Sequence, residues 1–96
     1  TESVLIGGSG TGNSSAIDTT AFNVVGIAFS SSNTTDPITI QASIDSTNYF
    51  TLTQLVYPLR TIELSQPAFK FYRASQTDTT GIPSTLNITV SKRYLI

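Results

Sequence analysis

Apolar and polar residues alternate in two stretches of the chain. Residues 38–45 read ITIQASID and residues 85–95 read TLNITVSKRYL, and in each the apolar residues recur at every second position. A period of two places alternate side chains on opposite faces of a strand, so both stretches predict half-buried β-strands. The apolar residues of these and neighbouring runs that we expect in the core are Ile38, Ile40, Ile44, Leu52, Leu86, Ile88 and Val90.

Shorter runs elsewhere have the same character. They are rich in aromatic and β-branched residues, which favour strands, and they cover residues 21–29, 49–55, 60–64 and 69–75. Clusters of Ser, Thr, Asn, Asp, Gly and Pro separate the runs, and these residue types favour turns. The sequence therefore predicts an all-β fold: a single antiparallel β-sandwich, jelly-roll-like, with six or seven strands.

The first fifteen residues differ from the rest. Val4, Leu5 and Ile6 precede GGSGTGNSS, which holds four of the six glycines. That composition is typical of a flexible connector, so we expect residues 1–15 to form an N-terminal arm and residues 16–96 the sandwich domain. The apolar run either forms an edge strand of its own sandwich or pairs with a neighbouring subunit by strand addition.

The other end of the chain is also apolar. Tyr94, Leu95 and Ile96 follow Lys92 and Arg93. These apolar residues either complete the last strand of the sandwich or are buried at a subunit interface, with the cations at its rim.

An aromatic run raises the same question within the chain. Period two places Phe69, Phe71 and Arg73 on one face of a strand and Tyr72 and Ala74 on the other, so one core cannot bury all the aromatic rings. Phe69 and Phe71 either line a closed edge of the sandwich or belong to a partner surface.

Composition restricts the chemistry. The 96 residues include no His, Cys, Met or Trp, but 16 Thr and 13 Ser, and only 11% are charged. Because no spacing joins a carboxylate to a second catalytic group, we expect no enzyme and no catalytic residue. The aspartates form no D-x-D-x-D-G array, so we expect neither a metal ion nor another cofactor.

Charge and hydropathy restrict the partners. The formal net charge is −1 and the five cations are dispersed, so we expect no nucleic-acid binding. No apolar stretch approaches the roughly 20 residues that cross a bilayer, and no basic leader is present, so we expect no membrane association. A small residue at position 1 favours synthesis in the cytoplasm after removal of an initiator Met. Small domains gain robustness from association, so we expect a homo-oligomer, a dimer or a trimer.

Three segments together resemble a known pattern. ITIQASIDSTNYFTLTQL, the later FKFYRAS and the final LNITVSKRYLI are similar to small jelly-roll or galactose-binding-like β-sandwiches, with Ser46 at the usual glycine and Tyr49 at the usual tryptophan. Short Thr/Ser-rich, cysteine-free chains with an apolar and glycine-rich leading segment also resemble virion proteins of tailed bacteriophages, especially proteins that decorate or cement the capsid.

The resemblance implies a capsid decoration or cement protein. It would lie on the virion surface and stabilise the shell by binding the major capsid protein or another virion protein. Its partner interface would contain Val4, Leu5, Ile6, Phe69, Phe71, Arg93, Tyr94, Leu95 and Ile96. The alternative is a carbohydrate- or receptor-binding module of a tail, fibre or host-attachment accessory, in which Asp45 and Asn48 hydrogen-bond a sugar and Tyr49 stacks on its ring.

Overall fold

The computed structural model describes residues 2–8, 10–65 and 67–94, and within these residues all regular structure is β. The chain forms more strands than the six or seven expected, because two short strands near the N-terminus join the sheets. In chain order the strands are β1 (Glu2–Ile6), β2 (Thr11–Asn13), β3 (Ile17–Asp18), β4 (Val24–Ser31), β5 (Ile38–Ser43), β6 (Phe50–Leu55), β7 (Thr61–Ser65), β8 (Phe71–Thr77) and β9 (Ser84–Arg93).

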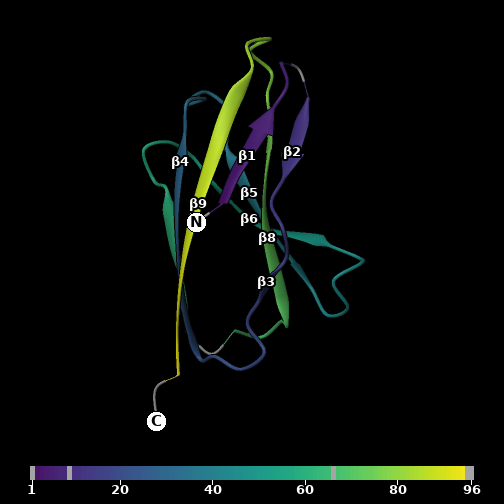
Figure 1. Cartoon of the computed structure of the whole chain (residues 1–96), viewed down its shortest axis with the longest axis vertical. Helices are drawn as coiled ribbons and strands as arrows, with labels where there is room; N and C mark the ends of the chain where they lie inside the picture. Colours follow the sequence, from purple (N-terminus) through teal and green to yellow (C-terminus); the bar gives the residue numbers. More distant parts are fainter. Residues whose placement is uncertain (1, 9, 66, 95–96) are drawn as a thin grey trace.

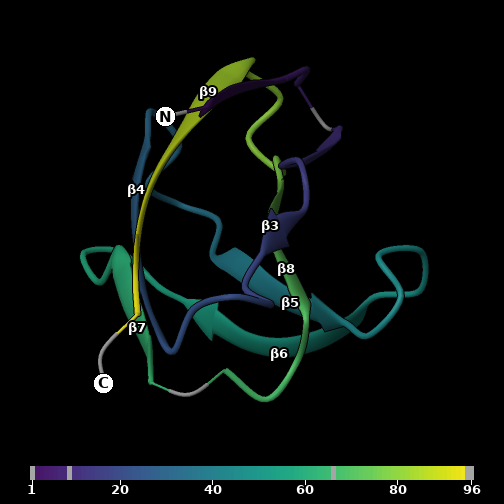
Figure 2. The ribbon, with the colours of Figure 1, turned by 60° about the horizontal axis from the view of Figure 1, so that its bottom comes forward.

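The strands form two antiparallel sheets that pack face to face (Figures 1 and 2). One sheet has the order β1-β9-β4-β7 and the other the order β2-β8-β5-β6, with β3 pairing with β8 beyond the end of β2. The predicted antiparallel sandwich is therefore confirmed.

The pairing is that of a jelly roll. If β2 and β3 count as one interrupted strand, the chain has eight strands, and the first pairs with the last, the second with the seventh, the third with the sixth and the fourth with the fifth. Two further pairs, β4 with β9 and β5 with β8, join these ladders into the two sheets. This rolled-up hairpin is the arrangement of double-sheet jelly rolls.

The core lies between the sheets and follows the alternation of the sequence. Strand β5 contributes Ile38, Ile40 and Ala42, and β9 contributes Leu86 and Ile88, all at most 2% exposed. Val90, also expected in the core, is half-buried and packs against it. The other buried apolar residues are Ile6, Ile17, Val25, Ile27, Phe29, Leu55, Tyr72 and Ala74.

Two residues expected in the core lie outside it. Ile44 is exposed because β5 ends at Ser43 and the chain turns away into a loop. Leu52 is exposed because β6 carries a bulge: Thr51 pairs with Gln41 and Thr53 with Ile40, which leaves Leu52 as the extra residue. A bulge changes the face on which the following side chains lie, and strict alternation does not reveal it.

The segment expected as an arm is built into the sandwich. Strand β1 pairs with β9 and β2 pairs with β8, so residues on both sides of the glycines close one edge of the fold. A Cβ at Gly12 would lie 2.5 Å from the Cγ1 of Ile6, so this glycine allows the two sheets to approach each other. Of the two alternatives for this run, the edge strand of its own sandwich is the one the structure contains.

Candidate interaction surfaces

The N-terminal residues expected at an interface alternate in their environment. Ile6 is 1% exposed and belongs to the core, so it is not on the surface where an interface was expected, and Val4 is half-buried and packs against that core. Leu5 points to the opposite face of β1 and is 81% exposed. Leu5 is therefore the most accessible residue of this run.

The C-terminal residues expected at an interface are partly accessible. Arg93 ends β9 and is exposed, and Tyr94 after it is 68% exposed. Leu95 and Ile96 lie outside the described residues.

The two phenylalanines of the aromatic run have different roles. Phe69 precedes β8 and packs against the core, with its ring 5.0 Å from Phe50 and 6.3 Å from Tyr72, both edge-on. Such geometry is the preferred one for aromatic pairs. Phe71 is half-buried on the outer face of β8, where it pairs with Ser43. Phe69 therefore lines a closed edge of the sandwich, which is one of the two alternatives that the sequence left open.

Two aspartates join loops at one end of the sandwich. Asp36, between β4 and β5, accepts hydrogen bonds from the Thr79 backbone N–H (2.8 Å) and the Thr79 hydroxyl (2.7 Å) across the sandwich. Asp78, after β8, accepts from the backbone N–H and hydroxyl of Thr80. These hydrogen bonds lower the pKa of both carboxyls. Both carboxylates are therefore engaged in holding loops together.

Asp45 organises the loop between β5 and β6. Its carboxylate accepts the backbone N–H groups of Asn48 and Thr47 (both 2.9 Å), the Asn48 side-chain amide (3.0 Å) and the Ser43 hydroxyl (2.9 Å). These donors, the Asn48 N–H first among them, hold the pKa of Asp45 far below its usual range. Ser46 has a φ of 63°, the left-handed conformation that favours glycine. Asp45 and Asn48, expected to bind a sugar, are hydrogen-bonded to each other.

Tyr49 lies beside an arginine that the sequence analysis left out of the candidate site. The Arg73 guanidinium carbon is 4.0 Å from the centroid of the Tyr49 ring, and Arg73 Nε donates a 2.6 Å hydrogen bond to Gln41 Oε1. Arg73 and Gln41 are paired across β8 and β5 on the outer face of the sheet. At least part of the Tyr49 ring face is therefore covered by the protein itself.

The strongest apolar exposure is on β6 and the turn after it, residues 50–59, which we call the β6 edge segment. Its exposed apolar residues are Phe50, Leu52, Val56, Tyr57 and Leu59, and their exposed fractions run from 43% to 64%. Strand β6 ends its sheet and pairs only with β5 among the described strands, so one side of its backbone is open. In Figure 2, β6 crosses beneath β5 between two projecting loops.

The β6 edge segment differs from the other sheet edges in charge. No charged residue occurs between Asp45 and Arg60, whereas β1 carries Glu2, β3 carries Asp18 and β7 carries Glu63. Charged side chains on an edge discourage pairing with another chain. The interface predicted from the sequence does not include this surface. The absence of charged residues from 46 to 59 is the sequence feature that could have indicated it.

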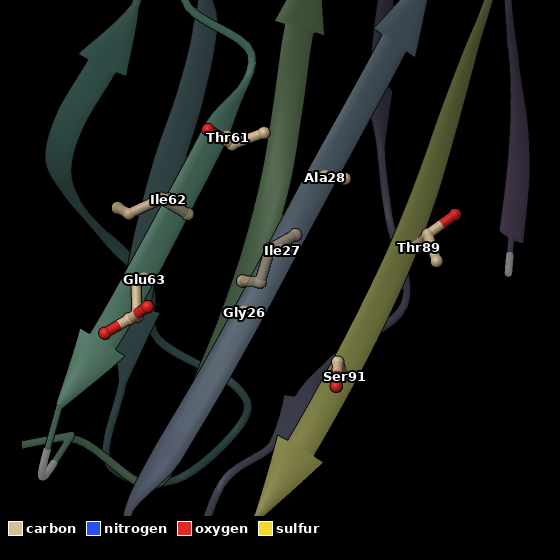
Figure 3. Close-up of a pocket in the computed structure, with 8 residues that line it drawn as sticks. All are labelled: Gly26, Ile27, Ala28, Thr61, Ile62, Glu63, Thr89 and Ser91. Atoms are coloured by element: carbon tan, nitrogen blue, oxygen red, sulfur yellow. The ribbon is translucent and has the colours of Figure 1, made fainter.

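A shallow hollow of about 360 Å³ lies on the outer face of the other sheet (Figure 3). Its floor is Gly26 and Ala28 on β4, where a Cβ added to Gly26 would meet open space. Thr61 and Glu63 from β7 lie on one side and Thr89 and Ser91 from β9 on the other. Only one of the lining side chains is titratable, so the hollow offers no acid–base pair.

In the described part of the chain, no three acidic residues gather in a group that could hold a metal ion. Nor do the described residues contain a helix of the length and hydropathy needed to cross a bilayer. Comparison with protein-family models, curated protein sequences and solved structures returns no match.

Proposed function

We propose that this protein is a structural binding protein that decorates or cements a virion shell, and that it attaches through the β6 edge segment. The observation that carries the proposal is the edge strand β6, which is open, apolar and uncharged, whereas the other sheet edges carry charged residues. An exposed edge of this kind is a template for pairing with another chain. The partner would be the major capsid protein or another virion protein.

The attachment would combine two kinds of contact. The free backbone groups of β6 would hydrogen-bond a strand of the shell protein, which extends the β2-β8-β5-β6 sheet by one strand. Apolar side chains of the segment, Leu52, Val56 and Leu59 among them, would fill pockets on the partner and be removed from water. Symmetry would repeat this contact over the shell, so a modest affinity at each site would give strong overall attachment.

The proposal includes no catalytic role. Asp45 and Asp78 accept hydrogen bonds within their own loops and Asp36 accepts them from Thr79 across the sandwich, and those bonds stabilise the ionised carboxylates. A general base needs an accessible lone pair and a pKa near the working pH, and a carboxylate with a lowered pKa lacks the second property. The aspartates serve the fold in this interpretation.

The proposal is tested by measuring how two variants, each with a lysine in place of an exposed leucine, bind to viral shells. Particles of the virus that encodes the chain would be stripped of this protein and mixed with purified protein, and co-sedimentation would give the affinity. We expect Leu52→Lys to weaken binding by about tenfold or more, since a charge on the edge disfavours strand addition. Leu5→Lys, which places the same charge on the opposite edge of the sandwich, should leave the affinity unchanged.

Two results would overturn the proposal. Failure of the wild-type protein to bind the stripped shells would exclude the decoration role. Equal weakening of binding by Leu5→Lys and Leu52→Lys would exclude β6 as the attachment site. Circular dichroism of both variants shows that the sandwich is intact, because both residues are exposed and contribute little to the core.

A further inference from the structure

We infer that Arg73, held on the outer face of the second sheet, is the receptor for a carboxylate, and that its ligand is an acidic sugar. This inference is independent of the proposed attachment through β6. It rests on three observations: how Arg73 is held, what is left of its hydrogen-bonding capacity, and which side chains surround it.

Arg73 is held from two directions. Tyr72 and Ala74 on either side of it in β8 are buried in the core, so Arg73 points outward from the sheet. Its Nε donates to Gln41 Oε1 at 2.6 Å, and its guanidinium lies 4.0 Å from the centroid of the Tyr49 ring. A side chain fixed by stacking and by a hydrogen bond loses less conformational entropy when it binds a ligand.

The charge of Arg73 has no counter-ion in the described part of the chain. Arg73 contacts Gln41 and Tyr49 there, and both side chains are neutral. No carboxylate of the described residues forms an ion pair with Arg73. Since Nε is occupied by Gln41, the two terminal nitrogens remain as donors. They form the end-on fork that binds both oxygens of a carboxylate. Arg73 is half-buried, and partial removal from water strengthens such an attraction.

The surroundings of Arg73 favour a sugar over an apolar peptide. The register of β8, β5 and β6 places neutral hydroxyl or amide side chains on the same outer face, and Phe71 is the apolar exception beside them. Of these neighbours Thr39, Gln41 and Thr51 reach the surface, whereas Ser43 and Ser75 are buried and the Ser43 hydroxyl donates to Asp45. Hydroxyls and amides complement the hydroxyl groups of a sugar ring, while Arg73 complements its carboxylate. A uronic acid unit carries both kinds of group.

This site differs from the one that the sequence predicted. Asp45 and Asn48 are engaged with each other, and a carboxylate such as Asp45 would repel an acidic sugar. In this site Tyr49 stacks against the Arg73 guanidinium and holds it in place, whereas the sequence predicted that Tyr49 stacks on the sugar ring. The predicted site would bind the hydroxyl groups of a sugar through the Asp45 carboxylate. The site inferred here would bind the carboxylate of an acidic sugar through the Arg73 guanidinium.

Titration of the ¹⁵N-labelled protein tests the inference, with the Arg73 Nε–Hε resonance as the reporter. Three probes are used: a tetrasaccharide containing glucuronate, the same tetrasaccharide with its carboxylates reduced to alcohols, and a tetraglutamate peptide. We expect the glucuronate tetrasaccharide to shift the Arg73 resonance with saturation, and the reduced one and the peptide to bind at least about tenfold more weakly.

Three variants assign the effect to the guanidinium. Arg73→Gln and Arg73→Lys should each weaken binding of the glucuronate tetrasaccharide by about tenfold or more, because lysine keeps the charge but lacks the planar fork. Arg93→Gln makes the same change in net charge as Arg73→Gln at an exposed residue of β9, and it should bind like the wild type. Arg73→Lys also serves if Arg73→Gln does not fold.

Each other outcome overturns the inference. Equal binding of the reduced tetrasaccharide would exclude recognition of the carboxylate. Equal or tighter binding of tetraglutamate would make the site a receptor for acidic protein segments instead of sugars. Equal weakening by Arg93→Gln would show a general attraction between charges with no defined site.

Discussion

Among the individual residues, the aspartates stabilise the fold most visibly, because their carboxylates accept hydrogen bonds in the loops. Each of the four whose pKa is lowered, Asp18, Asp36, Asp45 and Asp78, accepts hydrogen bonds from a residue one to three positions away or from a loop across the sandwich. Ser, Thr and Asn next to aspartate favour such turns. The hydroxyl-rich composition is thus used to satisfy loop backbone and carboxylates.

The lowered pKa values predict acid-sensitive stability. A carboxyl whose pKa is lower in the folded than in the unfolded chain stabilises the fold above the unfolded value, which is 3.8 for Asp, and this stabilisation is lost as the pH falls through the folded value. We expect the urea midpoint to be constant above about pH 5 and to fall steadily below pH 4. Urea unfolding followed by circular dichroism between pH 7 and pH 2 measures this.

Asp45→Asn isolates one of these carboxyls. At pH 7 the variant should unfold at lower urea than the wild type, and the difference should shrink as the pH falls below 3.8, where the carboxyl of the unfolded wild-type chain is protonated. Glu63→Gln on the exposed edge strand β7 is the control and should follow the wild type. A difference between Asp45→Asn and wild type that persists unchanged at pH 2 would contradict the charge-based explanation.

At the scale of the element, β1 shows how one strand is defined by its partner. The apolar run Val4 to Ile6 left two alternatives open, an edge strand of its own sandwich or pairing with another subunit, and β9 supplies a full antiparallel ladder for it. Gly12 then permits β2 to lie against Ile6. Glycines that looked like a flexible connector are therefore needed, at this position, for close packing of two strands.

Paired substitutions in β1 test its place in the sandwich. Ile6→Ala removes a side chain that is 1% exposed and should lower the free energy of unfolding by about 2–5 kcal/mol. Leu5→Ala, one residue away on the outer face, should change it by less than about 0.5 kcal/mol. Chemical denaturation of both variants gives the two values, and similar small effects would mean that β1 is not packed on the core in solution.

At the scale of the whole molecule, the jelly-roll pairing makes stability depend on segments that are distant in sequence. The first strand pairs with the last, and the second with the seventh, so both ends of the chain are needed to complete the sheets. A fold of about 100 residues has little stability to spare. Loss of an end strand therefore affects the whole sandwich.

Removal of residues 1–12 tests this dependence. The truncation deletes β1 and most of β2, and it uncovers Leu86 and Ile88 on β9. We expect the truncated chain to be unfolded or aggregated by circular dichroism and light scattering. A synthetic peptide of residues 1–15 added in trans should restore part of the β signal. A truncated chain that stays a folded monomer of unchanged stability would show that these residues act as the arm that the sequence suggested.

The sequence by itself determined the fold class, because strand periodicity and turn chemistry are local properties. The alternation in residues 38–43 and 86–90 placed side chains correctly in the core, and Ser, Thr, Asp and Pro clusters marked where strands stop. The jelly-roll-like sandwich that the sequence predicts agrees with the strand pairing. The role that the resemblance to virion proteins implies is a proposal.

Only the tertiary structure decided which strands pair, and with them the surfaces open to partners. The bulge that exposes Leu52, the ladder that fixes Ile6 in the core and the stacking of Arg73 on Tyr49 all join residues that are far apart in the chain. The register of distant strands and the packing of their side chains depend on how all the strands bury their apolar faces in one core. A local pattern of apolar and polar residues does not contain that information.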